Sequence, residues 1–255
     1  MFIFMKELSS PQHPLIKHLV KLRQNHDYRW HHQTLVLEGI KLIAEASSLL
    51  TFKTILASSP HLLPKNVKAE KIILAAPALI QKVSGLQSSE GILAEAPMPK
   101  FSNLYGKKYL LALDRINDPG NLGTIIRSAI ALGWEGIFLL EGTCDPFNEK
   151  ALRASRGAVF KIPMRQGAWK DLQEIIKVNN LQGLVADIKG VPFEQIKPSA
   201  GVLLVLSNEA QGPSPEAFSI GSPITVPMSG EMESLNVSVA AGLLLYSLRQ
   251  KRELL

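Results

Sequence analysis

The sequence has little cysteine and no long hydrophobic run. Cys144 is the single cysteine among 255 residues, which excludes a disulfide framework and a cysteine-rich metal site. No apolar stretch approaches the roughly 18 residues needed to span a membrane. The first ten residues, MFIFMKELSS, have neither the basic start nor the apolar core of a secretory signal. We therefore expect a cytoplasmic protein, and we expect no bound metal.

Histidine is confined to the first quarter of the chain. The six histidines are His13, His18, His26, His31, His32 and His61. Chemistry in the rest of the chain must therefore proceed without imidazole, which excludes a Ser-His-Asp triad or a histidine-ligated metal built wholly there. The chain also has no G-x-G-x-x-G segment and no Walker loop. These absences argue against a nicotinamide- or nucleotide-dependent enzyme.

Positive charge is concentrated in the first part of the chain. Residues 1–100 contain 12 Lys and Arg against 7 Asp and Glu, whereas residues 101–255 contain 16 against 15. Leucines at helical spacing predict an amphipathic helix over residues 10–28. Its basic residues either contact RNA or form a solvated face, and the pattern favours neither. These basic residues are Lys17, Lys21, Arg23 and Arg29.

A proline-marked linker divides the chain into two predicted domains. Short apolar runs alternate with helical or turn segments through residues 1–96, which is typical of a small α/β domain. Residues 97–106 form the linker, and residues 107–255 form the second domain. Strands and helices alternate in the second domain, which predicts a parallel sheet. Its predicted strands are Tyr109–Leu113, Gly136–Leu140, Phe160–Pro163, Gly183–Ala186, Val202–Leu206 and Ile224–Met228.

The second domain opens with a strand–loop–helix–strand unit. The strand Tyr109–Leu113 is followed by the turn Asn117-Asp118-Pro119-Gly120. A helical pattern then runs over residues 122–132 and ends before Gly133. The polar loop therefore lies at the carboxyl end of the first strand, where open α/β sheets bind ligands.

Arg127 is unusual within this unit because it is the only charged residue between Asp118 and Glu135. Its neighbours are small or apolar, and an unpaired buried charge costs several kcal/mol. The guanidinium therefore either binds a partner in a cavity or reaches solvent over its own methylenes.

Two further polar loops follow strand-like runs. Residues 207–213, SNEAQGP, carry Glu209, either as a capping carboxylate or as the partner of a buried cation. Residues 229–236, SGEMESLN, precede a long helix predicted from Val237 to about Arg249. Ser234 or Asn236 is a natural cap for that helix, and its first amides suit a carboxylate or a phosphate.

Three separated blocks carry a resemblance to a known family: NDPGNLGTIIRSA, LSNEAQGPSPE and ITVPMSGEMESLNVSVAAGLLLY. Together they resemble the SpoU/TrmH group of RNA 2′-O-ribose methyltransferases, in the SPOUT class. The pieces LVLEGIKLIAEA and SSEGILA are similar to the substrate-binding domain of that family, a ribosomal-protein-like RNA-binding fold. The resemblance spans nearly the whole chain.

The resemblance implies an α/β fold whose parallel sheet ends in a carboxyl-terminal trefoil knot, preceded by a small α/β RNA-binding domain. It implies a homodimer that uses S-adenosylmethionine to methylate a ribose 2′-hydroxyl, with ribosomal RNA favoured over transfer RNA. Carried over by position, the active-site polar residues are Asn121, Arg127, Glu209, Ser234 and Asn236. The residues expected to contact the cofactor are Ser207, Gly212, Val226, Met228 and Leu235.

The second block departs from the family pattern G-N-E-G-x-G-L. Ser207 and Ala210 stand at the first two glycine positions, and Pro213 stands at the leucine. If either glycine position needs a positive φ, the residue present here is strained and cofactor affinity falls. These changes motivate one alternative from another class, a non-catalytic RNA-binding or ribosome-assembly protein on the same scaffold. A transfer RNA 2′-O-methyltransferase is the other alternative.

Overall fold

The computed structural model describes residues 4–198 and 201–250. Its contacts divide the chain into two units. The first comprises Met1–Pro99 with Phe147–Phe160, and the second comprises Lys100–Pro146 with Lys161–Leu255. The first division lies within the predicted linker 97–106. The domain boundaries 1–96 and 107–255 themselves stay predictions.

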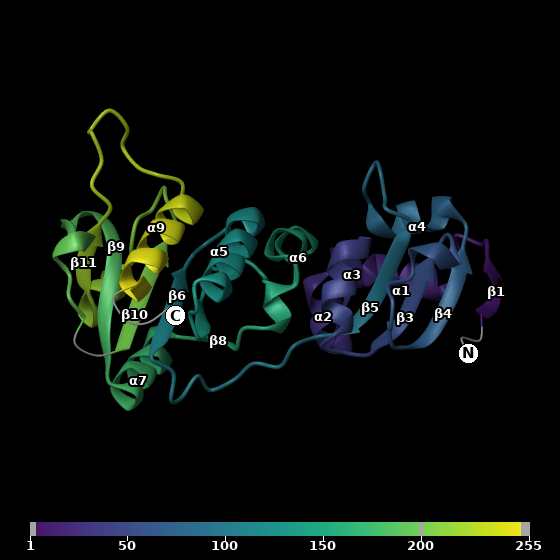
Figure 1. Cartoon of the computed structure of the whole chain (residues 1–255), viewed down its shortest axis with the longest axis horizontal. Helices are drawn as coiled ribbons and strands as arrows, with labels where there is room; N and C mark the ends of the chain where they lie inside the picture. The colour runs from purple at the N-terminus through teal and green to yellow at the C-terminus, as the bar shows by residue number, and fades with distance from the viewer. Residues whose placement is uncertain (1–3, 199–200, 251–255) are drawn as a thin grey trace. The chain divides into compact units, whose positions relative to one another are not determined.

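The first unit contains a five-stranded mixed sheet (Figure 1). Strand β5 pairs antiparallel with β2 and β3, whereas β4 pairs parallel with β1 and β3. Residues of α1 and α4 form one buried cluster with residues of the sheet. The elements are β1 (Phe4–Leu8), α1 (Pro14–Gln24), α2 (His26–His32), β2 (Thr34–Glu38), α3 (Ile40–Ser47), β3 (Phe52–Ala57), the short 3₁₀ helix η1 (Pro60–Leu62), β4 (Ala69–Ala75), α4 (Pro77–Ser84), β5 (Ile92–Pro97), α6 (Glu149–Ser155) and the 3₁₀ turn η2 (Ala158–Phe160).

The second unit contains a six-stranded sheet in the order β11-β9-β10-β6-β7-β8, and every neighbouring pair is parallel. This confirms the predicted parallel α/β architecture. The elements are β6 (Tyr109–Asp114), α5 (Pro119–Ala131), β7 (Gly136–Leu140), β8 (Met164–Gly167), α7 (Trp169–Asn179), β9 (Leu181–Pro192), the 3₁₀ helix η3 (Phe193–Gln195), β10 (Gly201–Ser207), α8 (Pro215–Ile220), β11 (Ser222–Thr225) and α9 (Val237–Gln250).

Alternate residues of the central strands face opposite layers of helices. Leu110 of β6 and Leu203 of β10 share a buried cluster with residues of α7 and α8. Helix α9 packs against α5 and contacts β10 (Figure 1). The indole Nε1 of Trp134 donates to the carbonyl oxygen of Leu245 at 3.1 Å, which fixes α9 beside the end of α5. The knot stays an expectation from the family resemblance.

Several predicted elements need correction. The single helix expected over residues 10–28 is broken at Asn25, whose backbone is extended and whose side chain caps α2 by accepting from the amide of Tyr28 at 2.8 Å. The strand expected at Phe160–Pro163 is wrong, because that edge strand is β8, a few residues later. Strand β9 is longer than the predicted Gly183–Ala186, and β11 ends before Pro227, which has no amide to donate.

None of the helices within residues 4–198 and 201–250 is both long and apolar enough to cross a membrane. Two of the four basic residues, for which the sequence leaves both RNA contact and a solvated face open, instead serve the fold. Arg29 is buried, and its guanidinium donates to the carbonyl oxygens of Leu22 and Arg23 at 2.8 and 3.0 Å. The guanidinium of Arg23 donates to Glu149 of α6 at 3.0 Å. Lys17 and Lys21 are exposed.

Candidate cofactor and active site

A cavity of about 680 Å³ lies in the second unit, at the carboxyl ends of β9, β10 and β11. Its wall includes residues from the loop after β10 and from the loop between β11 and α9. All five residues predicted to contact the cofactor line this cavity: Ser207, Gly212, Val226, Met228 and Leu235. Glu209 and Ser234, predicted as active-site residues, line it as well. Contact of these residues with a cofactor stays a prediction.

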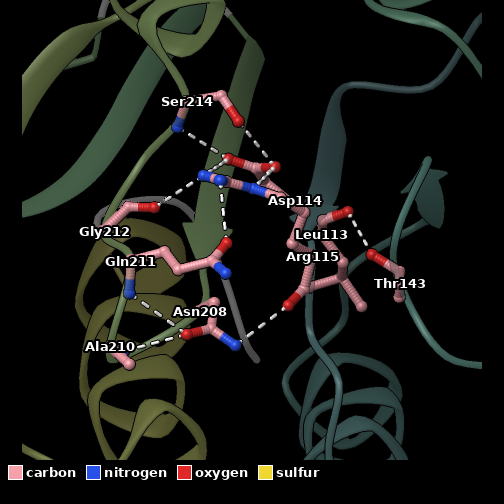
Figure 2. A network of polar contacts seen from close by, with 9 residues as sticks. All are labelled: Leu113, Asp114, Arg115, Thr143, Asn208, Ala210, Gln211, Gly212 and Ser214. Carbon is pink, nitrogen blue, oxygen red and sulfur yellow. Dashed lines mark hydrogen bonds and ion pairs between the residues drawn. The ribbon is translucent and has the colours of Figure 1, made fainter.

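The loop after β10, residues 208–214, is held by a polar network that begins at the end of β6 (Figure 2). Asp114 is almost fully buried, and its carboxylate accepts from the amide and the hydroxyl of Ser214 at 2.8 and 3.0 Å. The guanidinium of Arg115 donates to the same carboxylate at 2.9 Å. A buried carboxylate needs such donors, because an unpaired charge there costs several kcal/mol.

Arg115 extends this network directly into the loop. Its guanidinium donates to the side-chain oxygen of Gln211 at 2.9 Å and to the carbonyl oxygen of Gly212 at 2.8 Å. Its own backbone has a φ of 56°, in the left-handed region that a side chain disfavours. Figure 2 shows the guanidinium lying between Asp114 and the loop. Arg115 therefore connects the end of β6 to the wall of the cavity.

Asn208 organises the start of the loop. Its side-chain oxygen accepts from the amides of Ala210 and Gln211 at 2.9 and 3.2 Å, and its side-chain nitrogen donates to the carbonyl oxygen of Arg115 at 3.3 Å. Within the loop, Gly212 is the residue with a positive φ, at 67°. Ser207 and Ala210 have no positive φ, so the backbone strain considered for them does not arise. This removes the observation that favoured a non-catalytic scaffold.

Three predicted active-site side chains meet beside the cavity. The side-chain nitrogen of Asn236 donates to the side-chain oxygen of Asn121 at 3.1 Å. The carboxylate of Glu209 accepts from the amide of Val237 at 2.6 Å and from the side chain of Asn121 at 3.5 Å. Because these residues come from α5, the loop after β10 and the start of α9, the cluster joins three distant segments of the sequence.

The first turn of α9 explains why Glu209 is held there. Asn236 caps the helix, since its side-chain oxygen accepts from the amide of Ser238 at 2.9 Å. The amide of Val237 has no partner within the helix, and the positive end of the helix dipole favours an anion. The carboxylate predicted to suit these amides is therefore the protein's own Glu209.

Arg127 does not join this cluster. It lies on the exposed face of α5, six residues beyond Asn121, which corresponds to about 9 Å along the helix axis. Among the residues that the structure describes, it makes no hydrogen bond and no ion pair. Of the two alternatives given for Arg127, the structure therefore shows the second: its guanidinium reaches solvent and does not pair with Glu209.

The charge of the cavity wall is predominantly negative. The lining includes the acidic residues Asp187, Glu209 and Glu233 against the single base Lys189. Apolar side chains such as Leu206, Ile224 and Leu244 form other parts of the wall. A site of this kind suits a ligand that combines an apolar ring system with positive charge.

Cys144 follows β7 in the same unit and lies outside the cavity wall. Burial, with smaller contributions from Asp118 and Asp145, raises the pKa of its thiol to about 11. The thiol is therefore protonated at neutral pH and is a poor nucleophile.

The comparisons with known proteins cover both units. A model of the SpoU rRNA Methylase family matches residues 108–246, and a model of the MRM3-like substrate binding domain matches residues 13–94. The chain is 30% identical over 249 residues to the 23S rRNA (guanosine(2553)-2′-O)-methyltransferase RlmP of Bacillus subtilis, covering 96% of this chain and 100% of that protein. It is 30% identical over 190 residues to the 23S rRNA (guanosine-2′-O-)-methyltransferase RlmB of Acinetobacter baylyi, covering 68% and 75%.

The chain is also similar to a solved structure of an rRNA methyltransferase. The AdoMet-bound rRNA methyltransferase from Sinorhizobium meliloti is 28% identical, with a TM-score of 0.85 over 96% of this chain and 98% of that chain. Sequence and fold thus agree over almost the entire length. Because the family model covers more than half of the residues, the chain belongs to the SpoU rRNA methylase family.

Proposed function

We propose that the protein transfers a methyl group from S-adenosylmethionine to a ribose 2′-hydroxyl of ribosomal RNA. One observation carries the proposal: Glu209 lies on the wall of the cavity and accepts a hydrogen bond from Asn121, which in turn accepts one from Asn236. A cofactor in the cavity and a ribose at the polar cluster would then be neighbours. The names of the relatives in Bacillus subtilis and Acinetobacter baylyi favour ribosomal RNA.

The cavity suits this cofactor in size and charge. Its volume of about 680 Å³ lies within the usual range for small-molecule sites. When bound, S-adenosylmethionine supplies an electrophilic methyl group on a positively charged sulfur. The carboxylates of Asp187, Glu209 and Glu233 balance that positive charge. Gly212 and Met228 would contact the cofactor from the two loops, together with Ser207, Val226 and Leu235.

The polar cluster holds the ribose in our proposal. Methyl transfer needs the attacking oxygen in line with the sulfur–carbon bond, so the main task of the protein is positioning. The carboxamides of Asn121 and Asn236 present donors and acceptors to the ribose hydroxyls, and Ser234 adds a hydroxyl from the cavity wall. Glu209 keeps the two asparagines in register, because its carboxylate also binds the first amide of α9.

Arg127 acts as a cation in this proposal. Deprotonating a free guanidinium near pH 7 costs about 7 kcal/mol, so Arg127 is a poor base. Its exposed position on α5 leaves it able to bind the phosphate beside the target ribose and to stabilise the developing alkoxide. A planar guanidinium can bind a phosphate through two parallel N–H groups, which an ammonium cannot.

We also propose that two copies of the chain associate through α9. Val239, Leu243 and Tyr246 recur at helical spacing on this helix, and they are 51%, 44% and 47% exposed. A stripe of large apolar side chains on one helix is the kind of surface that a second copy covers. We expect light scattering to give twice the chain mass at micromolar concentration. Leu243→Glu should give monomers, and a wild-type monomer would contradict the proposal.

The methylation itself is tested with purified protein, S-adenosylmethionine labelled in its methyl group and unmodified RNA made by transcription. We expect label in 23S ribosomal RNA, recovered as a 2′-O-methylnucleoside by mass spectrometry. Label found only in transfer RNA would mean that transfer RNA is the substrate, and the proposed methyl transfer would still stand. Isothermal titration without RNA measures cofactor binding, and an absence of heat would support a non-catalytic scaffold.

We place the protein in the cytoplasm, where a reduced Cys144 is expected.

A further inference from the structure

A second pocket lies in the first unit, at the corner between α1 and α2. Its volume is about 370 Å³, and it is lined by Lys21, Asn25, Asp27, Tyr28 and His31. These residues all belong to the first unit, so the pocket is separate from the cofactor cavity. No residue of the proposed methyl-transfer site contributes to it.

Aromatic rings dominate this corner. The ring of Tyr28 lies 4.2 Å from that of His32 and 5.6 Å from that of His18, measured between centroids. His31, on the pocket wall, contacts His32 edge to face at 5.1 Å. Ring clusters of this kind are normally buried, whereas His31 and His32 are exposed and Tyr28 is half-buried. The cluster therefore offers ring surface to a ligand.

A buried carboxylate fixes the orientation of Tyr28. Glu95 of β5 is 6% exposed, and its carboxylate lies 3.2 Å from Nε2 of His18. The opposite ring nitrogen, Nδ1 of His18, lies 2.9 Å from the hydroxyl of Tyr28. This chain of polar contacts runs from the sheet through α1 to α2. It holds the tyrosine ring in one position before any ligand arrives, which lowers the entropic cost of stacking on it.

Positive charge lies beside the ring. The ammonium group of Lys21 is 5.6 Å from the centroid of Tyr28, and Lys17 is exposed one turn earlier on the same helix. Lys21 is exposed and flexible, so it can move from the ring face to a phosphate. Asp27 is the one acidic residue of the lining, and its carboxylate can accept hydrogen bonds from the edge of a base.

We propose that this pocket binds one unpaired RNA base, stacked on Tyr28 and His31, with the neighbouring phosphate on Lys21. The proposal rests on the proposed function in that RNA is the substrate. It adds a site that recognises a base rather than the backbone alone. Stacking of a base on an aromatic side chain is a common and sequence-tolerant mode of single-strand recognition.

The test measures binding of the full-length protein to two labelled probes by fluorescence anisotropy, without cofactor. One probe is a short single-stranded RNA of mixed sequence, and the other is an abasic ribose–phosphate oligomer of the same length. Tyr28→Leu keeps an apolar side chain against the core but removes the ring. We expect it to weaken binding of the RNA by about 5- to 100-fold and to leave the abasic oligomer unchanged.

Other variants separate stacking from folding and from charge. His31→Ala changes an exposed side chain and should weaken binding of the RNA probe but not of the abasic probe. This variant tests stacking even if Tyr28→Leu fails to fold. Tyr28→Phe keeps the ring but loses the hydroxyl that His18 holds, so it should bind RNA more tightly than Tyr28→Leu and somewhat more weakly than wild type. Lys21→Ala should weaken both probes equally. Tyr105→Leu is the matched control, because Tyr105 is an exposed tyrosine of the second unit with a hydroxyl bonded to Glu174 at 2.8 Å.

Wild-type RNA binding by both Tyr28→Leu and His31→Ala would overturn the proposal. If Tyr28→Leu and His31→Ala each weaken binding of the two probes equally, the proposal is also overturned, in favour of a site for phosphate alone. The result is independent of methyl transfer, because the assay contains no cofactor. If the proposed methylation fails while the Tyr28 effect persists, the base-binding site stands and the catalytic function falls.

Discussion

The two units differ in the charged and aromatic side chains that surround their pockets. The first has a mixed sheet, all six histidines and a cluster of ring contacts around Tyr28. The second has a parallel sheet, no histidine, and a cavity lined by amides, carboxylates and apolar side chains. Ring systems and flexible lysines suit a polymer whose bases and phosphates must be held. Fixed amides and carboxylates suit a small cation held in a single orientation.

This contrast predicts which property a mutation in each unit should change. Changes in the first unit should alter RNA affinity or the stability of that unit, and leave cofactor affinity unchanged. Changes around the cavity should alter cofactor affinity or the rate of methyl transfer, and leave RNA affinity unchanged.

The largest expected effect is at Arg127. Arg127→Ala should lower the single-turnover rate of methylation by about 100-fold, because the cation that binds the phosphate beside the target ribose is lost. Arg127→Lys should recover only part of the rate, because an ammonium lacks the planar fork. Since the guanidinium is exposed and makes no bond within the described chain, neither change should alter thermal stability. A folded Arg127→Ala protein with a near wild-type rate would refute the catalytic role.

The next effect concerns stability, and it contrasts two basic residues of the first unit. Arg29→Ala leaves two buried carbonyl oxygens without their donor and should lower the free energy of unfolding by about 2 kcal/mol. Lys17→Ala removes an exposed charge, so it should leave stability unchanged and reduce the salt slope of RNA binding by about one. Chemical denaturation and salt titration measure the two quantities. Equal behaviour of the variants would contradict the division between fold and RNA contact.

In the second unit, a change at Arg115 should lower cofactor affinity and leave the maximal rate nearly unchanged. Arg115→Ala frees the loop at Gly212 and should weaken cofactor binding by about tenfold, equivalent to about 1.4 kcal/mol. The maximal rate at saturating cofactor should stay within about twofold of wild type, because Arg115 touches no reacting atom. Arg115→Lys should recover part of the affinity. Isothermal titration and steady-state kinetics separate these effects.

Arg165 provides the matched control for Arg115. It lies in the same unit, near Asp171 at 3.5 Å, and it donates to the carbonyl oxygen of Asn103 at 3.4 Å. It contributes nothing to the cavity wall. Arg165→Ala should therefore leave cofactor affinity unchanged. If both variants lose affinity equally, the effect of Arg115 is on general stability and not on the loop.

The resemblance to the SpoU/TrmH family predicts that Asn121, Glu209 and Asn236 belong to one site, and the sequence agrees because polar loops follow β6, β10 and β11. The carboxyl ends of parallel strands share one edge of a sheet, so such loops converge. The apolar runs also marked most of the strands in the second unit. Boundaries were less certain: β8 begins after Pro163, since its pairing with β7 decides its position and the local sequence does not.

The network around Arg115 could not be predicted. Its positive φ has no sequence signal, and its partner Gly212 lies 97 residues away. The structural roles of Arg23 and Arg29 could not be predicted for the same reason. Glu149, which binds Arg23, is 126 residues distant, and the carbonyl oxygens that bind Arg29 become available only where α1 ends. The pattern of an amphipathic helix indicates which face carries a basic residue, but it does not indicate which partner its guanidinium binds.

The smallest expected effect is at His32, in the cluster beside Tyr28. Partial desolvation, followed by the positive charges of His18, His31 and Lys53, lowers the pKa of His32 below 6.5, although Glu95 opposes the shift. The folded chain thus favours the neutral ring. Its contribution to stability is complete above the ordinary pKa of 6.5 and is lost as the pH falls through the lowered value.

Titration of the histidine ring protons by nuclear magnetic resonance measures this shift directly, with His32→Asn assigning the resonance. We expect the His32 midpoint to lie below 6.5 and to move back toward that value in His31→Asn, because one positive neighbour is then removed. Because every histidine lies within the first 61 residues, the experiment reports on the first unit alone. A midpoint at or above 6.5 would mean that Glu95 outweighs the positive neighbours.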